Sequence, residues 1–272
     1  MRLHRESVIF IFLLFFLPGL VSANDTLQQR FSPPFGFSRV TVQPNSFAAW
    51  LRAIPLQEAG SPVLDFRDRE SKKAGDSTVA AVVDFNISGK RLEQCMDILL
   101  RFYSDYLITN GKRDSLQIPL PDGLLLSWKE WQEGWRPYFK GFNFHFSQTA
   151  QTDSSQKNFE CYLAEIFSYS GSHTFYYFFS QIPADEIKIG DFIVRKNRKG
   201  HAVLIMDLVE NERGQKMVMV GQGDTPACQF YILKGKDGSP WFSLNSSTDY
   251  LPLPIKKKMY LRGLRRFPAY TD

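Results

Sequence analysis

Cysteine and histidine are scarce in this sequence, with three and four residues respectively among 272. No two cysteines are spaced as Cys-x-x-Cys, and no Cys/His spacing is typical of zinc, so neither a metal nor another cofactor is expected. An odd number of cysteines leaves at least one thiol unpaired within a single chain. Cys95, Cys161 and Cys228 therefore permit at most one disulfide, and at least one of them is a free thiol.

Long apolar runs are also missing, apart from the one between Val8 and Leu17. That run is too short for a membrane-spanning helix, which needs about 20 residues. Arg2 and Arg5 precede it, and a small-x-small cleavage site follows it. This order predicts a secretory signal peptide over residues 1–23, and hence an exported protein, periplasmic or secreted, whose mature chain does not span a membrane. The alternative is an uncleaved N-terminal anchor.

A strong charge of either sign is lacking as well. The net charge is +5, of which the predicted signal peptide carries +1, which leaves +4 for the mature chain. No nucleic-acid-binding motif is present, so nucleic acid is not an expected partner. Basic residues gather over 256–266, where they could meet peptidoglycan or another anionic envelope polymer. A solvated surface is the simpler interpretation of that cluster.

Apolar periodicity predicts both helices and strands along the rest of the chain. We expect helices over 46–54, 89–107, 158–168 and 174–180, a charged loop over 67–77, and strands over 62–66, 78–85, 117–120, 123–127, 189–194, 201–209, 216–221 and 228–233. These elements predict an α+β fold with a mixed, mainly antiparallel sheet, partly barrel-like, that is flanked by helices. Residues 24–272 are assigned to one domain, with a soft internal boundary in the Ser/Thr/Gln-rich stretch near 147–157.

Two of the cysteines lie on predicted helices. Cys95 falls near the second turn of the helix over 89–107, and Cys161 falls in the first turn of the helix over 158–168. A thiol near a helix N-terminus can have a lowered pKa, because the helix dipole favours the thiolate. The alternative is that each is a small buried apolar residue, as most free cysteines are.

A tryptophan-rich stretch forms a candidate binding surface. Trp128, Trp131 and Trp135 are spaced so that they share one face of a helical turn, and Arg136 follows directly. If exposed, this stretch could bind a substrate, with Trp131 and Arg136 as the contacting residues and the rings stacked on sugars. If buried, the rings belong to the core, which is the interpretation we favour. His145 is expected on the solvent side of a strand.

The most distinctive histidine is His201, which follows a glycine at the start of a predicted strand. Asp207 shares its sheet face, but six residues of strand span about 20 Å, too far for a hydrogen bond. The partner of His201 must therefore come from the next strand. The hairpin register places Asp224 opposite His201, with Gln222 one diagonal away. We prefer Gln222 as the partner, because the glycine and proline around Asp224 indicate that the strand is already ending there, and we assign Asp224 to substrate binding.

The order of these features resembles the NlpC-type cell-wall cysteine peptidases, which have a papain-like fold. The shared features are a helix with Cys, a Gly-Asp turn and strand, a Gly-His strand, and a polar residue on the following strand. The resemblance implies Cys161 as nucleophile, His201 as base and Gln222 as the residue that orients the base. It covers roughly residues 159–222. The string at Cys161 is Glu-Cys-Tyr-Leu, where that family usually has Asp-Cys-Ser-Gly.

The whole mature chain also resembles a family of exported bacterial proteins of unknown function. The matching strings include RLEQCMDILLRFYSDYL, the GD…GHAV hairpin and GQGDTPACQ. Cys95 matches a characteristic position of that family and Cys161 does not, which favours Cys95 as the nucleophile. The sequence thus leaves two hypotheses open. One is an envelope cysteine hydrolase that acts on peptide or amide bonds of cell-wall material. The other is a non-catalytic envelope binding or scaffolding protein on the same fold.

Overall fold

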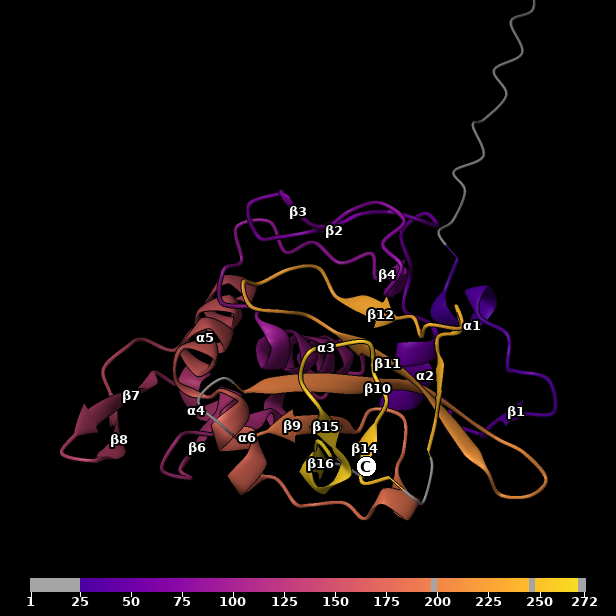
Figure 1. The fold of residues 1–272 in the computed structure, drawn as a ribbon. Coiled ribbons are helices and arrows are strands. Elements are labelled where there is room, and N and C mark those ends of the chain that lie inside the picture. Colours follow the sequence, from indigo (N-terminus) through magenta and orange to yellow (C-terminus); the bar gives the residue numbers. More distant parts are fainter. Residues whose placement is uncertain (1–24, 197–199, 245–247, 269–272) are drawn as a thin grey trace, which may run out of the picture.

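The computed structural model describes residues 25–196, 200–244 and 248–268, so the predicted signal peptide lies outside the described residues. An eight-stranded antiparallel sheet forms the centre of the molecule (Figure 1). Its strand order is β16 (Leu264–Arg265), β9 (Phe192–Arg195), β10 (His201–Glu210), β11 (Lys216–Gln222), β12 (Tyr231–Leu233) and β4 (Val79–Val82), while β1 (Ser38–Arg39) pairs with β10 and β13 (Trp241–Ser243) pairs with β11. The predicted α+β class and mainly antiparallel sheet are confirmed.

The sheet is open, so the expected partial barrel does not form. Its ends are β16 and β4, and within the described residues these two strands do not pair with each other. β16 is two residues long and β4 four, so neither edge is long enough to curl the sheet back onto the other. The central strand β10 is buried along almost its whole length, which explains why it is mostly apolar, with Asp207 as the buried charged exception.

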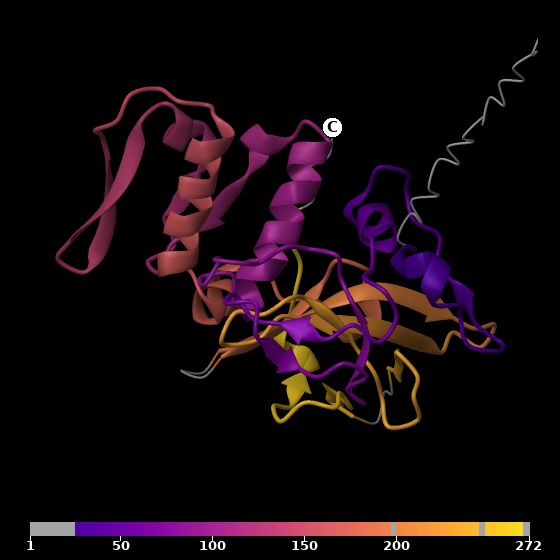
Figure 2. The same ribbon diagram turned by 90° about the horizontal axis from the view of Figure 1, so that it is seen from above.

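Two helices cover one face of the sheet and small strands lie over the other (Figure 2). α2 (Phe47–Arg52) and α3 (Cys95–Thr109) pack against β10. The opposite face carries the β14–β15 pair (Tyr250–Leu251 and Met259–Tyr260), whose second strand packs against β9. Further short elements are α1 (Leu27–Arg30), β2 (Val63–Leu64), β3 (Glu70–Lys72), η1 (Arg113–Ser115), η2 (Ala184–Glu186) and η3 (Leu261–Gly263).

A second group of elements projects beyond one end of the sheet (Figures 1 and 2). It consists of β5 (Gln117–Pro119), β6 (Leu125–Ser127), α4 (Trp128–Gln132), β7 (Trp135–Lys140), β8 (Asn143–Gln148), α5 (Gln156–Tyr169) and α6 (Ser172–Phe178). Edge-to-face ring contacts join Trp128 to Phe159 and Tyr162 at its centre. The expected soft boundary falls between β8 and α5, and the assignment of one domain stays a prediction.

Most predicted elements are present with shifted ends. Ser46 caps α2 by accepting a hydrogen bond from the Ala49 amide at 3.2 Å, as its position before an apolar run indicates. The stretch 67–77, expected to be a loop, contains β3, which pairs with β2. The largest shift concerns α3, which begins at Cys95 instead of near residue 89. Residues 89–94 form turns because the Asp97 carboxylate accepts from the Gln94 amide in a capping box, which fixes Gln94 as the N-cap.

Candidate active site

His201 is the first residue of β10 and its side chain is only 3% exposed. The preceding Gly200 is required by packing, since a Cβ there would lie 1.7 Å from Ser172 Oγ and 3.0 Å from the Arg195 carbonyl oxygen. The Gly200 carbonyl oxygen also accepts a hydrogen bond from Lys257 Nζ at 3.0 Å. The Gly-His pair is therefore closely packed where β10 begins, which leaves the imidazole little freedom.

The imidazole is bound from the neighbouring strand, since His201 Nε2 lies 2.7 Å from Gln222 Oε1. The expected contact with Gln222 is thus present. The register that produces it differs in detail, because Glu210 pairs with Lys216 and not with Gln215. A bulge between Ile205 and Asp207 compensates for this one-residue shift.

A second hydrogen bond fixes the amide of Gln222. Its Nε2 donates to the hydroxyl of Tyr231 on β12, so its Oε1 is directed at His201. The Oε1 atom can only accept, which assigns the proton of the neutral imidazole to Nε2 and leaves Nδ1 with a lone pair. The network therefore presents His201 as a base at Nδ1.

Asp207 has a different role, since six residues of strand place it too far from His201 for a hydrogen bond. It is fully buried, and its carboxylate accepts from Arg39 Nε at 2.6 Å and from Arg52 Nε at 2.8 Å. These two ion pairs connect the N-terminal segment to the central strand. Asp207 therefore holds the fold together and takes no part in the His201 network.

Cys95 is the first residue of α3, and the helix N-terminus faces the start of β10. The backbone amides of Ala202, the residue after His201, and of Met96 both act to lower the pKa of the Cys95 thiol. Burial nevertheless dominates and raises the pKa of the Cys95 thiol, with the Asp97 charge acting in the same direction. Burial also lowers the pKa of His201, despite its bond to Gln222. Both groups are therefore neutral near pH 7.

Charged residues surround the pair. Asp224, a predicted substrate-binding residue, is partly exposed and acts on His201 through its charge, which favours the imidazolium. Lys257 acts on both His201 and Cys95, favouring the neutral imidazole and the thiolate. The loop after β11 is tied to the helix cap, because Thr225 Oγ1 donates to Gln94 Oε1 at 3.0 Å.

Two glycines on either side of Gln222 permit this close assembly, and the sequence analysis did not use them. A Cβ on Gly221 would lie 2.3 Å from the Phe230 ring, and one on Gly223 would lie 2.9 Å from Ile98 Cγ2 on α3. α3 can therefore approach β11 only because these positions lack side chains. In the sequence, the Gly-Gln-Gly string is the feature that could have indicated this close contact.

Cys161 lies apart from this cluster in the described contacts, whereas Cys228 borders it beside Asp224 and Tyr231. Cys161 is exposed in the second turn of α5, not the first as expected, and its electrostatic partner is Arg136. Cys228 is fully buried, and burial raises its pKa to about 12. The chain positions that the structure describes hold all three as free thiols. Of the candidate nucleophiles, only Cys95 shares a hydrogen-bonded neighbourhood with His201.

Trp131 is buried, which is the interpretation favoured from the sequence, and at 5% exposure it offers no stacking surface to a substrate. The indole donates to Asn158 Oδ1 at 2.9 Å, and the guanidinium carbon of Arg136 lies 3.9 Å from the centre of a Trp131 ring. Arg136 also donates to the Trp131 carbonyl oxygen at 2.6 Å. Both residues thus stabilise the junction of α4, β7 and α5. The expected exposure of His145 is confirmed.

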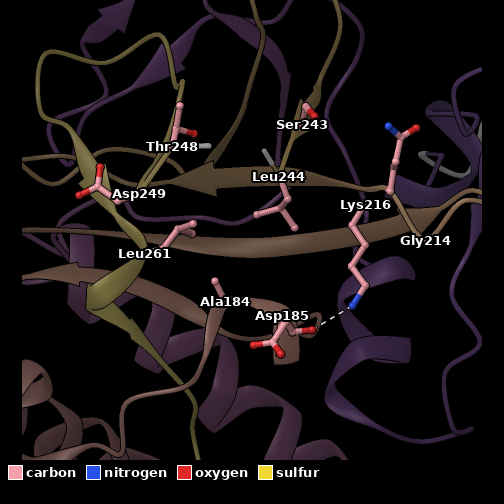
Figure 3. Close-up of a pocket in the computed structure, with 10 residues that line it drawn as sticks. Ala184, Asp185, Gly214, Lys216, Ser243, Leu244, Thr248, Asp249 and Leu261 are labelled. Carbon is pink, nitrogen blue, oxygen red and sulfur yellow. Dashed lines mark hydrogen bonds between the residues drawn. The ribbon is translucent and has the colours of Figure 1, made fainter. Parts of the chain in front are cut away.

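A cavity of about 800 Å³ lies at the opposite end of β11 from Gln222, beside Lys216 (Figure 3). Lys216, at the start of β11, borders it and donates from Nζ to the Asp185 carbonyl oxygen at 3.0 Å. Seven residues of strand separate the two ends by about 20 Å. The cavity is therefore a separate feature from the His201 cluster.

Over the described ranges, no helix has the length and apolar character needed to cross a bilayer. No curated protein matches the chain, and no solved structure does. A family model does match, over residues 27–259, and that span includes Cys95, His201, Gln222 and Tyr231. Since the match covers most of the sequence, this chain belongs to the family described as "Domain of unknown function (4846)".

Proposed function

We propose that this protein is a cysteine hydrolase that cleaves peptide or amide bonds, with Cys95 as nucleophile, His201 as base and Gln222 as the residue that orients the base. The supporting observation is that the Ala202 amide, next to His201, acts on the Cys95 thiol, while the imidazole is held through Nε2 by Gln222. NlpC-type peptidases use the same three roles on a helix N-terminus and two adjacent strands, but the stretch that resembles them, residues 159–222, does not include Cys95.

The proposed reaction uses the free Nδ1 of His201. As Sγ of Cys95 attacks the carbonyl carbon, Nδ1 takes the thiol proton. The negative charge then develops on the carbonyl oxygen, where the backbone amide of Cys95 at the N-terminus of α3 can stabilise it. Collapse of this intermediate breaks the C–N bond, and the imidazolium returns its proton to the leaving amine. Water, activated by the same imidazole, hydrolyses the thioester and restores the thiol.

The pKa of His201 is lowered and that of Cys95 is raised, which fits concerted proton transfer better than a preformed thiolate–imidazolium pair. A neutral imidazole can accept a proton throughout the range above its lowered pKa, and the neutral thiol retains the proton until attack. The side chain of Cys95 is 8% exposed, so only a slender substrate segment would reach it without movement of neighbouring loops. An extended peptide is such a segment.

The substrate class follows from the predicted compartment. The N-terminal sequence predicts export, and the amide-rich polymer of the bacterial envelope is peptidoglycan, an anionic material that suits the mildly basic mature chain. Cell-wall peptide is therefore the proposed substrate, in the periplasm or outside the cell.

Thiol labelling tests the proposal. In a Cys161→Ser background, which removes the exposed thiol, Cys95 is alkylated with a small neutral electrophile over a range of pH and the modified residue is identified by mass spectrometry. We expect a rate that reaches a plateau once His201 is deprotonated, because His201 assists thiol ionisation. His201→Ala should lower the plateau by about tenfold or more, and Gln222→Ala should lower it less.

The same experiment covers the second hypothesis, a non-catalytic envelope binding protein. The burial of Cys95 and His201, and the separate cavity of about 800 Å³, favour that alternative. A binding protein would show labelling that rises only as hydroxide deprotonates a thiol of raised pKa, with the same profile in His201→Ala. That outcome would rule out the hydrolase.

A further inference from the structure

Exposed apolar side chains are concentrated in one part of this protein. Among the described residues, the large exposed ones are Phe35, Leu124, Leu125, Tyr138, Phe139, Phe142, Tyr169, Tyr177 and Phe178. All except Phe35 lie between residues 124 and 178, in the elements that project beyond the sheet. Isolated exposed apolar residues need no explanation, but a cluster of this kind marks an interaction surface.

The hairpin β7–β8, which projects from the molecule (Figure 2), carries the two most exposed rings between residues 124 and 178. Phe139 is 61% exposed and Phe142 is 93% exposed, on either side of Lys140 and Gly141. Gly141 has φ of 67°, which turns the chain tightly at the tip. Phe142 is thereby held in the turn itself, where it contributes almost nothing to the packing of the molecule.

The hairpin is a fixed element rather than a loose loop. Its strands pair in continuous register from Trp135↔Gln148 to Lys140↔Asn143. Phe144 is buried and packs edge-to-face on Tyr169 of α5, with ring centres 4.9 Å apart. Its amide donates to Asp122 Oδ2 at 2.6 Å, which ties β8 to the β5–β6 turn.

These ties place a second group of apolar side chains beside the hairpin. The β5–β6 turn that Asp122 begins continues into Leu124 and Leu125, which are both exposed. A Cβ on Gly123 in the same turn would lie 2.6 Å from the Phe178 ring, so Phe178 borders the turn as well. The exposed apolar residues therefore form an edge that runs from the hairpin tip to α6.

The charge on the hairpin is of one sign. From residue 135 to residue 148 the sequence contains Arg136 and Lys140 but no aspartate or glutamate. Lys140 is exposed between the two phenylalanines, and His145 is exposed on β8. Aromatic rings flanking a lysine at a projecting tip combine apolar insertion with attraction to anionic headgroups.

We propose that the tip of β7–β8 docks on an anionic phospholipid bilayer, with Phe139 and Phe142 inserted at the headgroup–acyl boundary and Lys140 bound to lipid phosphate. A narrow tip offers little area to a folded partner, since a stable protein interface buries about 800 Å² on each side. A bilayer accepts such a tip because it deforms around the inserted rings. Docking does not depend on the chemistry of Cys95.

Co-sedimentation with vesicles tests this proposal. The mature chain is mixed with phosphatidylcholine vesicles that either contain or lack phosphatidylglycerol. We expect partitioning into the anionic vesicles that weakens with salt, and Phe142→Ser should reduce it by about tenfold. Phe139→Ser/Phe142→Ser should reduce it further. Phe35→Ser is the matched control, because Phe35 is an equally exposed ring outside the projecting group and its loss should change nothing.

A spectroscopic measurement reports the depth of insertion. In Phe142→Trp, vesicles with brominated acyl chains should quench the new tryptophan, and Phe35→Trp should not be quenched. Folding of each variant is verified by an unchanged thermal melt. The proposal is overturned if the mature chain does not bind anionic vesicles at low salt, if Phe35→Ser weakens binding as much as Phe142→Ser, or if the exposed rings instead mediate a dimer detected by sedimentation velocity.

Discussion

The side-chain amide of Gln222 contacts His201 through its oxygen and Tyr231 through its nitrogen. The 2.7 Å contact between His201 Nε2 and Gln222 Oε1 and the bond from Gln222 to the Tyr231 hydroxyl join three consecutive strands of the sheet. All three side chains are buried, so water does not compete for these bonds. Any reactivity of Cys95 depends on this chain of contacts, since it sets which imidazole nitrogen carries the proton.

Tyr231→Phe should therefore destabilise the protein. The substitution keeps the ring but leaves the buried Gln222 amide nitrogen without an acceptor, which costs about 1–3 kcal/mol of the free energy of unfolding. Urea denaturation measures the change. Tyr138→Phe is the control, because its hydroxyl is on an exposed side chain and its removal should have an effect below about 0.5 kcal/mol. Equal effects of the two variants would contradict a role for Tyr231 in the network.

Gly200→Ala should destabilise the turn that carries His201. The added methyl group would collide with Ser172 and the Arg195 carbonyl oxygen, and overpacking of this kind costs about 1–3 kcal/mol. Ser172→Gly removes the closest of these contacts, so the double variant should regain part of the loss despite the intrinsic cost of glycine in a helix. Thermal melts of the two single variants and the double variant check this coupling. Additive losses would contradict it.

Arg101→Leu should be among the most damaging substitutions in α3. Arg101 is buried and lies 2.9 Å from Glu93 while also binding Glu160 on α5. Its loss leaves the buried Glu93 carboxylate without its partner, which typically costs about 3–5 kcal/mol. Arg69→Ala removes a pair in which the arginine is 62% exposed and Asp65 keeps hydrogen bonds from two backbone amides, so it should cost less than about 1 kcal/mol. Urea unfolding measures the loss in the free energy of unfolding for each variant. Similar losses in the two variants would contradict the prediction.

Sequence patterns predicted the strands around His201 well, because apolar alternation and turn residues are local signals. They also identified Gln222, since strand geometry excludes Asp207 and places the partner across the hairpin. The start of α3 could not be placed, because the apolar face of the helix continues back through Leu92. The capping contacts between Gln94 and Asp97 that fix its start are visible only in three dimensions.

The surroundings of the candidate site were less accessible to sequence reasoning. The meeting of Cys95 with the start of β10 joins segments about a hundred residues apart, and no local pattern reports such a contact. Burial of Trp131 was favoured from its spacing, but its bond to Asn158 and the stacking of Arg136 depend on the approach of α5. The one-residue bulge in β10 likewise depends on tertiary packing.

Asp97→Asn should stabilise the protein at neutral and alkaline pH. Burial raises the pKa of Asp97 from 3.8 to about 8, so between these values the folded state keeps a proton that the unfolded state has lost. The free energy of unfolding of the natural chain therefore falls as pH rises through that window. Asparagine does not titrate, and its Oδ1 can still accept from the Gln94 amide. We expect a gain of at least about 2 kcal/mol at pH 8 that shrinks to nothing below about pH 4.

Urea unfolding of the natural chain and of Asp97→Asn at several pH values measures this effect. The lowered pKa of His201 makes stability fall as pH drops below about 6.5, but that slope is common to both proteins and cancels in the difference. Asp97→Ala is the control, because it removes the charge together with the acceptor for the helix cap and should be destabilising at pH 4. A gain for Asp97→Asn that does not depend on pH would show that Asp97 is ionised in the folded protein. The carboxylate beside Cys95 would then oppose thiolate formation at every working pH.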